Sequence, residues 1–105
     1  MYRQRNIIIV SDLDSWNECV AIVEDLNKLC AERGWAQGTL WTRTIGTFNE
    51  LSLEFEYPDL ATFQRETDEF IRDPATRDLN RRIDALRTEG TGYSELWEEA
   101  QPVIA

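Results

Sequence analysis

The sequence predicts a single α+β domain in which four strands and two helices follow one another in the order βαββαβ. Three observations lead to this prediction: a run of β-branched residues near the N-terminus, two stretches with apolar residues at helical spacing, and a segment between them in which apolar and polar residues alternate. No linker rich in Pro, Gly or Ser divides the 105 residues, so residues 1–105 are expected to form one domain with one core.

The first strand and the first helix are predicted from the N-terminal third of the chain. Residues 6–10 read Asn-Ile-Ile-Ile-Val, the pattern of a strand that is buried on both faces. After a turn at residues 11–14, Ser15 and Glu18 have the spacing of a capping box, so the helix is expected to begin there. Apolar residues then recur at steps of three and four until Gly34 ends the helix.

The middle of the chain predicts a β-hairpin. Residues 37–47 favour strand, and residues 51–57 alternate between apolar and polar side chains. A two-residue loop at positions 48 and 49 joins the two segments.

This loop sets a register in which Arg43 lies opposite Glu54, and Trp41 lies opposite Glu56. One face then carries Leu40, Thr42, Thr44, Gly46, Leu51, Leu53, Phe55 and Tyr57. The other face carries Trp41, Arg43, Ile45, Ser52, Glu54 and Glu56. A one-residue error would change the pairs, but the two faces of residues 51–57 would stay the same because they follow from alternation alone.

The second helix is expected to begin after Asp59, a suitable N-cap. Along this helix Leu60, Phe63, Thr67, Phe70 and Ile71 form a stripe. Asp73 and Pro74 interrupt this helix, and since proline is tolerated at the first helical position, Asp73 is expected to cap a continuation. Residues 93–99 form the last strand and residues 101–105 a tail.

Right-handed crossovers place the first and third strands in the middle of a four-stranded antiparallel sheet with both helices on one face, which is the ferredoxin-like arrangement. The other face of the sheet would expose a sizeable apolar area, and a second copy of the chain is the simplest cover for it. We therefore expect a twofold homodimer in which the two sheets face each other. The expected interface residues are Trp41, Arg43, Ile45, Glu54 and Glu56.

Composition narrows the class of partner. The chain carries 11 basic and 20 acidic residues, for a formal net charge of −9, and its arginines are dispersed. Nucleic acids and anionic membranes attract clustered basic residues, so we expect neither as a partner. The N-terminus lacks the pattern of a secretory signal, and no stretch approaches the roughly 20 apolar residues of a membrane span, so the cytoplasm is the expected location. Lys28 is the only lysine, an arginine bias that suggests a GC-rich bacterial genome.

The sequence contains no histidine and two cysteines. Cys19 and Cys30 are separated by about 16 Å along the predicted helix, too far to bond to each other, and are expected as small apolar side chains on its packed face. Without histidine or a second thiol at ligand spacing we expect no metal site of the usual kinds, no Ser-His or Cys-His pair and no His-ligated haem. The expected cofactor is none.

A candidate pocket is predicted from polar residues on the core face. Thr42 and Thr44 occupy positions where Val or Leu would fill a core, and they leave polarity and space beside Tyr57 and Trp16 or Trp35. Aromatic walls suit a planar ligand, and a Tyr hydroxyl or Asn amide can position it or stabilise an enolate-like anion. The alternative is an edge strand whose threonines merely favour strand geometry.

Glu54 and Glu56 form a second constellation, on the opposite face. Two nearby carboxylates can act as acid and base because their proton affinities are pushed apart. The alternative is a salt-bridged network with Arg43 across the hairpin or across a dimer interface.

Residues 53–63, which read Leu-Glu-Phe-Glu-Tyr-Pro-Asp-Leu-Ala-Thr-Phe, are followed by Asp-Pro at residues 73–74. With the chain length and the order of elements, this pattern resembles the dimeric α/β-barrel superfamily, and most closely its antibiotic-biosynthesis-monooxygenase-like and NIPSNAP-like proteins. The resemblance implies a homodimer with a small-molecule pocket between the sheet and the helices of each subunit. Asn6 matches in position an asparagine used by some monooxygenases of the group. The alternative for Asn6 is an ordinary turn or edge residue.

Two hypotheses for function follow. The resemblance implies a cofactor-free monooxygenase that acts on an aromatic or enolisable substrate, or an isomerase or cyclase of the same superfamily; the chain departs from the haem-dependent members because it has no axial histidine. The second hypothesis is a non-catalytic dimeric module that binds a metabolite or a protein. In the first case the expected catalytic residues are Asn6 and Tyr57, and the expected substrate-binding residues are Thr42, Thr44, Trp16 and Trp35.

Overall fold

The computed structural model describes residues 1–103, and the last two residues of the predicted tail lie outside this range. Its elements are β1 (Tyr2–Ile9), α1 (Leu13–Arg33), β2 (Thr39–Thr42), β3 (Glu50–Tyr57), α2 (Leu60–Arg72), α3 (Pro74–Asp84) and β4 (Tyr93–Glu98). The predicted order is confirmed, and the second helical stretch divides into α2 and α3 at Asp73, where the sequence predicted an interruption.

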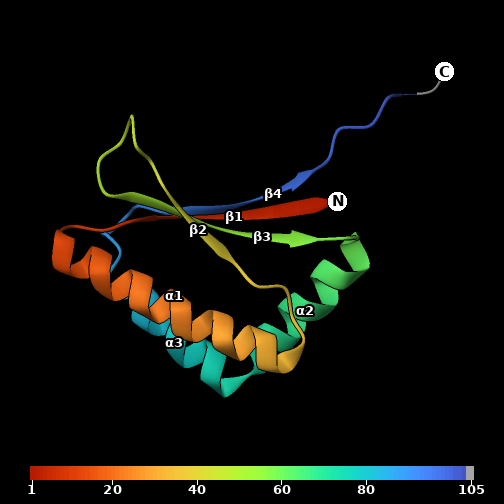
Figure 1. Ribbon diagram of the computed structural model, residues 1–105, viewed down its shortest axis with the longest axis horizontal. Helices are drawn as coiled ribbons and strands as arrows, with labels where there is room; N and C mark the ends of the chain where they lie inside the picture. The colour runs from red at the N-terminus through yellow and green to blue at the C-terminus, as the bar shows by residue number, and fades with distance from the viewer. Residues whose placement is uncertain (104–105) are drawn as a thin grey trace.

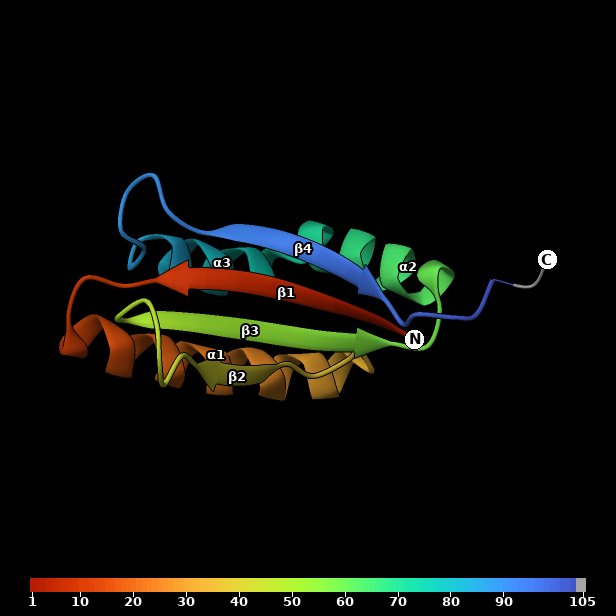
Figure 2. The same cartoon turned by 90° about the horizontal axis from the view of Figure 1, so that it is seen from above.

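The four strands form one antiparallel sheet in the order β2-β3-β1-β4. This order puts the first and third strands in the middle, as predicted, and is that of the ferredoxin-like fold. All three helices lie on one side of the sheet (Figure 1). Seen from the sheet side, α1 lies beneath β2 and β3, whereas α2 and α3 lie beneath β1 and β4 (Figure 2). No helix within residues 1–103 covers the opposite side, which we call the open face.

β1 begins at Tyr2, four residues before the predicted start at Asn6. The first half of the strand is polar, and its arginines face the open side of the sheet, where Arg5 pairs with Glu54 of the neighbouring β3. An ion pair across two strands is a long-range feature, so the local apolar pattern did not reveal this half of the strand.

α1 also begins earlier than predicted. Asp12, and not Ser15, is the N-cap: its Oδ1 accepts the Ser15 N–H at 2.7 Å. Asp and Ser cap helices about equally well, so local sequence does not decide between them. The other predicted helix ends are confirmed, with Gly34 in the left-handed conformation at φ 74° after α1, and Asp59 and Asp73 capping α2 and α3.

The predicted hairpin is present, but its first strand is shorter and its loop longer than expected. β2 covers only four residues, and the connection 43–49 has positive φ at Gly46 (128°) and at Asn49 (58°). These two positions are three residues apart, which favours a long connection over a two-residue turn.

The register of the hairpin therefore differs from the predicted one. Trp41 lies opposite Ser52, and Arg43 forms an ion pair with Glu50, so both predicted cross-strand pairs are wrong. The shift amounts to four residues, and an even shift keeps each strand residue on its predicted face. Thr42 of β2 and the alternating residues of β3 were thus placed on the correct faces of the sheet.

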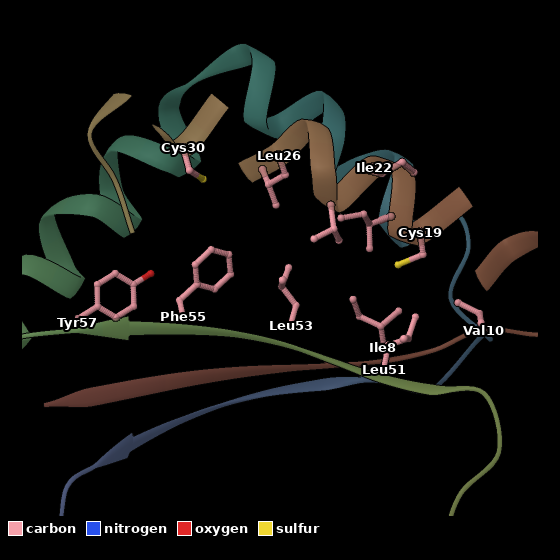
Figure 3. Packing of buried hydrophobic residues seen from close by; sticks show 12 residues of the cluster. Ile8, Val10, Cys19, Ile22, Leu26, Cys30, Leu51, Leu53, Phe55 and Tyr57 are labelled. Atoms are coloured by element: carbon pink, nitrogen blue, oxygen red, sulfur yellow. The ribbon is translucent and has the colours of Figure 1, made fainter. Parts of the chain in front are cut away.

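The core lies between the sheet and α1, with a contribution from α3 (Figure 3). Its buried members are Ile8, Val10, Leu51, Leu53, Phe55 and Tyr57 from the sheet side and Cys19, Ile22, Val23, Leu26, Cys30 and Ile83 from the helices. Both cysteines are free and buried, as the sequence predicted.

Candidate functional site

A cavity of about 120 Å³ lies between the sheet and the helices. β1 and β3 form its floor, while the three helices and the segment after α1 form its walls. A cavity of about 150 Å³ is known to hold benzene, so this one is close to the size of a single ring. Its apolar lining consists of Ile8, Leu26, Trp35, Ala36, Leu53, Phe55, Phe70 and Ile83, and its polar lining of Gln4, Asn6, Cys30, Tyr57, Glu66, Thr67, Asn80 and Arg87.

Tyr57 brings a phenol into this cavity. It is the last residue of β3, and strand alternation turns it toward the helices. Its ring packs edge-on against Phe63 of α2, with 5.2 Å between centroids, and its hydroxyl points up from the sheet toward the helices (Figure 3). Burial, with the charge of Glu66 and the neighbouring Cys30, raises the pKa of Tyr57 well above its ordinary value. The hydroxyl is therefore protonated and available as a donor.

Glu66 places a carboxylate in the same cavity. Glu66 is only 6% exposed although its side chain is ionisable. Its Oε1 accepts the Ala36 N–H at 2.7 Å. The sequence analysis missed this residue. A signal was available, because an acidic residue three positions after Phe63 and four before Phe70 lies on the core-facing side of the helix.

Cys30 adds a thiol from α1. Burial, reinforced by the charge of Glu66, raises the pKa of Cys30 to about 11. A thiol with this pKa is protonated near neutral pH, and the thiolate is the nucleophilic form. Cys30 therefore serves as part of the lining rather than as a nucleophile.

Trp35 forms an aromatic wall whose orientation is held from two sides. Its Nε1 donates to Oε2 of Glu69 at 2.6 Å, and its ring lies 6.1 Å from that of Phe70 at an interplanar angle of 50°. The segment that carries Trp35 is attached to α1, because the Asn27 amide donates to the Gly38 carbonyl at 2.7 Å and accepts the Gly38 N–H at 2.8 Å.

Asn6 lies in the middle of a central strand, so the alternative of a turn or edge residue is wrong. Its Nδ2 donates to the Leu53 carbonyl at 3.2 Å, and its Oδ1 accepts the Ser94 hydroxyl at 2.7 Å. An amide has two donor hydrogens and two acceptor lone pairs, so capacity remains for a molecule in the cavity.

Arg87 contributes the positive charge in the lining. Its Nε is buried and has no hydrogen-bond partner among the described residues, and its ion-pair partner Asp84 lies at 3.5 Å. Together with Glu66, it makes the formal charge of the lining zero.

Three predicted pocket residues lie elsewhere. Thr42 is exposed at the end of β2, Thr44 is exposed in the connection 43–49, and Trp16 packs against the core from the first part of α1. None of them lines the cavity described above. Of the predicted site residues, the cavity brings together Asn6, Trp35 and Tyr57.

The two carboxylates of the open face are paired with arginines. Glu54 lies 3.6 Å from Arg5 and 3.9 Å from Arg3, and Glu56 forms an ion pair with Arg3. A charge network is thus present at this position, but its cations come from β1, and Arg43, the predicted partner, pairs with another glutamate.

The open face also exposes aromatic side chains. Trp41, Tyr93 and Trp97 are 58%, 55% and 54% exposed, and the Arg5 guanidinium lies 5.3 Å from the Trp97 ring centroid. Ile45 is 88% exposed in the connection between β2 and β3, which rises on this side of the sheet (Figure 1).

Within residues 1–103, no three or more Cys, Asp or Glu side chains are grouped as metal ligands would be. The helices in the described part of the chain are all too short or too polar for a membrane span.

No protein-family model matches this sequence, and no curated protein sequence matches it either. Solved structures match the fold over nearly its whole length. An uncharacterised NIPSNAP domain protein from Burkholderia xenovorans has a TM-score of 0.75 at 18% identity, with 100% of both chains covered. SnoaB, a cofactor-independent oxygenase from Streptomyces nogalater, has a TM-score of 0.70 at 16% identity, with 97% of this chain and 95% of that chain covered.

A monooxygenase from the gene ActVA-Orf6 of Streptomyces coelicolor, in complex with Nanaomycin D, has a TM-score of 0.72 at 11% identity, with 99% of this chain and 91% of that chain covered. Identities this low establish the fold alone. The chain therefore has the ferredoxin-like fold of NIPSNAP-domain and antibiotic-biosynthesis-monooxygenase structures, and the resemblance predicted from the sequence is confirmed at that level.

Proposed function

We propose that this chain is a bacterial cytoplasmic protein that binds a small planar molecule in the cavity and oxidises it as a cofactor-independent monooxygenase. The observation that carries the proposal is the cavity itself, which is close to the size of one ring and combines aromatic walls with a protonated phenol and a buried carboxylate. The substrate is aromatic or enolisable. A methylene or methyl carbon beside a carbonyl is oxidised to a second carbonyl, with one atom of O₂ retained and the other released as water.

The lining residues have separate roles in this proposal. Trp35 and Phe70 stack against the planar substrate. Tyr57 donates to the oxygen that becomes negative when the substrate enolises, and Asn6 adds a second polar contact. Two structures with the same fold, at 16% and 11% identity, are described as an oxygenase and a monooxygenase, which supports this chemistry for the fold but leaves the substrate to be determined.

Two alternatives use the same cavity. A non-catalytic module that binds a metabolite or a protein is favoured by the Asn6 amide, since both its carbonyl and its amino group already bond to neighbouring strands. An isomerase or cyclase needs the same enolate stabilisation without O₂.

Acetophenone, an enolisable ketone with one aromatic ring, tests the cavity. We expect it to bind to the wild type by calorimetry, and we expect Thr67→Phe to weaken binding at least tenfold because the new ring fills space that the ligand needs. Gln64→Phe is the matched control, since it places the same side chain on the exposed side of α2. Unchanged binding by a folded Thr67→Phe would refute the cavity as the site.

Oxygen uptake separates the alternatives. An oxygenase consumes O₂ in the presence of a bound ketone and incorporates ¹⁸O from ¹⁸O₂, and Thr67→Phe suppresses both. Binding across a panel of enolisable aromatic ketones without oxygen uptake favours the isomerase if the product is a rearranged ketone, and the binding module if no product forms.

We further propose that the protein is a homodimer that buries the open face of the sheet. The support is an exposed aromatic surface on a sheet face that no described helix covers. The interface residues remain those expected from the sequence: Trp41, Arg43, Ile45, Glu54 and Glu56.

Native mass spectrometry tests this assembly. We expect a species of twice the 12.3 kDa chain mass, and Trp41→Glu should shift it to the monomer. Ile71→Glu is the matched control, because Ile71 is 62% exposed but lies on the helical side. Dissociation by the control alone would place the interface on the helices and refute the open-face dimer.

A further inference from the structure

The Glu66 carboxylate has more acceptor capacity than the protein uses. Two carboxylate oxygens offer about four acceptor sites, and in the described part of the chain the only hydrogen bond to Glu66 is the one from the Ala36 N–H to Oε1. Oε2 is left without a donor from these residues. The residue is only 6% exposed, so the carboxylate has little contact with bulk water, and its free acceptor sites face the cavity that it lines.

The groups beside Glu66 define what can bind to it. Tyr57 and Cys30 line the same cavity, and both are protonated near neutral pH, so they offer hydrogens to a ligand. Neither donates to Glu66 within residues 1–103. A hydroxyl group suits this arrangement because it can donate to the carboxylate and accept from the phenol at the same time. An ammonium group can only donate.

The charge of the lining selects against ions. Glu66 and Arg87 offset each other in formal charge, so the lining offers no net attraction to compensate an ion for the loss of its hydration. A neutral ligand does not incur this desolvation cost.

From this arrangement we propose that the cavity selects neutral aromatic ligands that carry a hydroxyl group, and that the Glu66 carboxylate binds this hydroxyl. The inference rests on the proposed function, since it specifies the substrate class of the same cavity.

Matched acetophenones provide the test on the full chain. 4-Hydroxyacetophenone is expected to bind at least tenfold more tightly than 4-methoxyacetophenone by calorimetry, because only the former can donate a hydrogen bond to a charged acceptor. Equal affinities would overturn the proposal. This comparison uses the wild type and so does not depend on the folding of a variant.

Glu66→Gln tests the assigned residue. The amide oxygen keeps an acceptor for the Ala36 N–H but removes the charge, so the preference for the hydroxyl is expected to fall below threefold. Asp68→Asn is the control, because it removes an exposed charge from the same helix and should leave the preference unchanged. A tenfold preference retained by folded Glu66→Gln would assign the hydroxyl to another group.

A cationic probe completes the test. Benzyl alcohol is expected to bind more tightly than benzylamine, and the opposite order would overturn the selection of neutral ligands. The outcomes also separate the two proposals. Failure of acetophenone to bind refutes the cavity function itself, whereas binding of acetophenone without a hydroxyl preference refutes only the role of Glu66.

Discussion

Replacing Asn27 with alanine removes the attachment between α1 and the segment that walls the cavity. The Asn27 side chain donates to the Gly38 carbonyl at 2.7 Å and accepts the Gly38 N–H at 2.8 Å, and Gly38 is buried. Without the amide, both backbone groups lose their partner inside the protein. The same segment carries the Ala36 N–H that binds Glu66, so the substitution links stability to the geometry of the site.

The expected cost follows from these two hydrogen bonds. Each contributes about 1 kcal/mol net, and a buried group left unsatisfied costs about 1–3 kcal/mol. Allowing for partial solvation of the opened segment, we expect Asn27→Ala to lower the free energy of unfolding by about 2–4 kcal/mol. For a domain of this size, the melting temperature should fall by roughly 10–20 °C.

Urea unfolding followed by tryptophan fluorescence and circular dichroism measures this loss. Asn17→Ala is the matched control, because Asn17 lies on the exposed side of the same helix and its replacement should stay within about 0.5 kcal/mol of the wild type. If Asn27→Ala also stayed within that range, solvent would be replacing the amide without penalty. The argument that this side chain holds the cavity wall would then be refuted.

Three further measurements test other parts of the structure. Gly38→Ala should lose about 1–3 kcal/mol in urea unfolding, because a Cβ there would lie 2.7 Å from Leu53 Cδ1; wild-type stability would contradict this packing. Cys30 should react with Ellman's reagent at pH 8 at least about 100-fold more slowly than a free thiol, since its pKa is raised from 9.0 to about 11, and rapid labelling of the folded protein would contradict its burial. Arg33 holds the pKa of Asp73 below its ordinary value, so the resulting stability is complete above the pKa of an unfolded Asp and is lost as pH falls through the lowered folded pKa. In Asp73→Asn the urea midpoint should therefore fall less than in the wild type as the pH decreases from 6 to 2. An equal fall in both proteins would contradict the ion pair of Arg33 with Asp73.

The parts of the fold that were predicted from the sequence depend on local periodicity. Alternation over residues 51–57 assigned the faces of β3, and these assignments survived a register error of four residues because strand faces repeat every two. The polar first half of β1 could not be predicted in this way. Its arginines become strand residues through pairing with Glu54 and Glu56 on a neighbouring strand, and that pairing depends on sheet order rather than on local pattern.

The residues of the candidate site also differ in whether the local sequence pattern predicts them. Tyr57 was predicted because alternation alone turns it toward the helices. Thr44 was placed in the pocket because the hairpin loop was assumed to be short, and the longer connection leaves it exposed. Glu66 was not predicted as a site residue because charged side chains are usually exposed to solvent, whereas its position on α2 turns it toward the core. A polar residue on an apolar helix face is therefore the more informative signal for a site than threonines on an edge strand.

Asn6 is hydrogen-bonded to the neighbouring strands and the Tyr57 hydroxyl is not, so only a Tyr57 substitution can test the reaction without disturbing the fold. The Asn6 amide joins β1 to both neighbouring strands, so Asn6→Ala disturbs the cavity floor as well as any contact with a ligand, and lost activity would not distinguish the two. The Tyr57 hydroxyl has no hydrogen bond to the protein within residues 1–103, and the packing of its ring against Phe63 does not need the oxygen. Tyr57→Phe should therefore keep the unfolding free energy within about 0.5 kcal/mol while lowering turnover of a bound enolisable ketone by about 10²–10³-fold. Unchanged turnover in this stable variant would exclude the phenol as the group that stabilises the enolate.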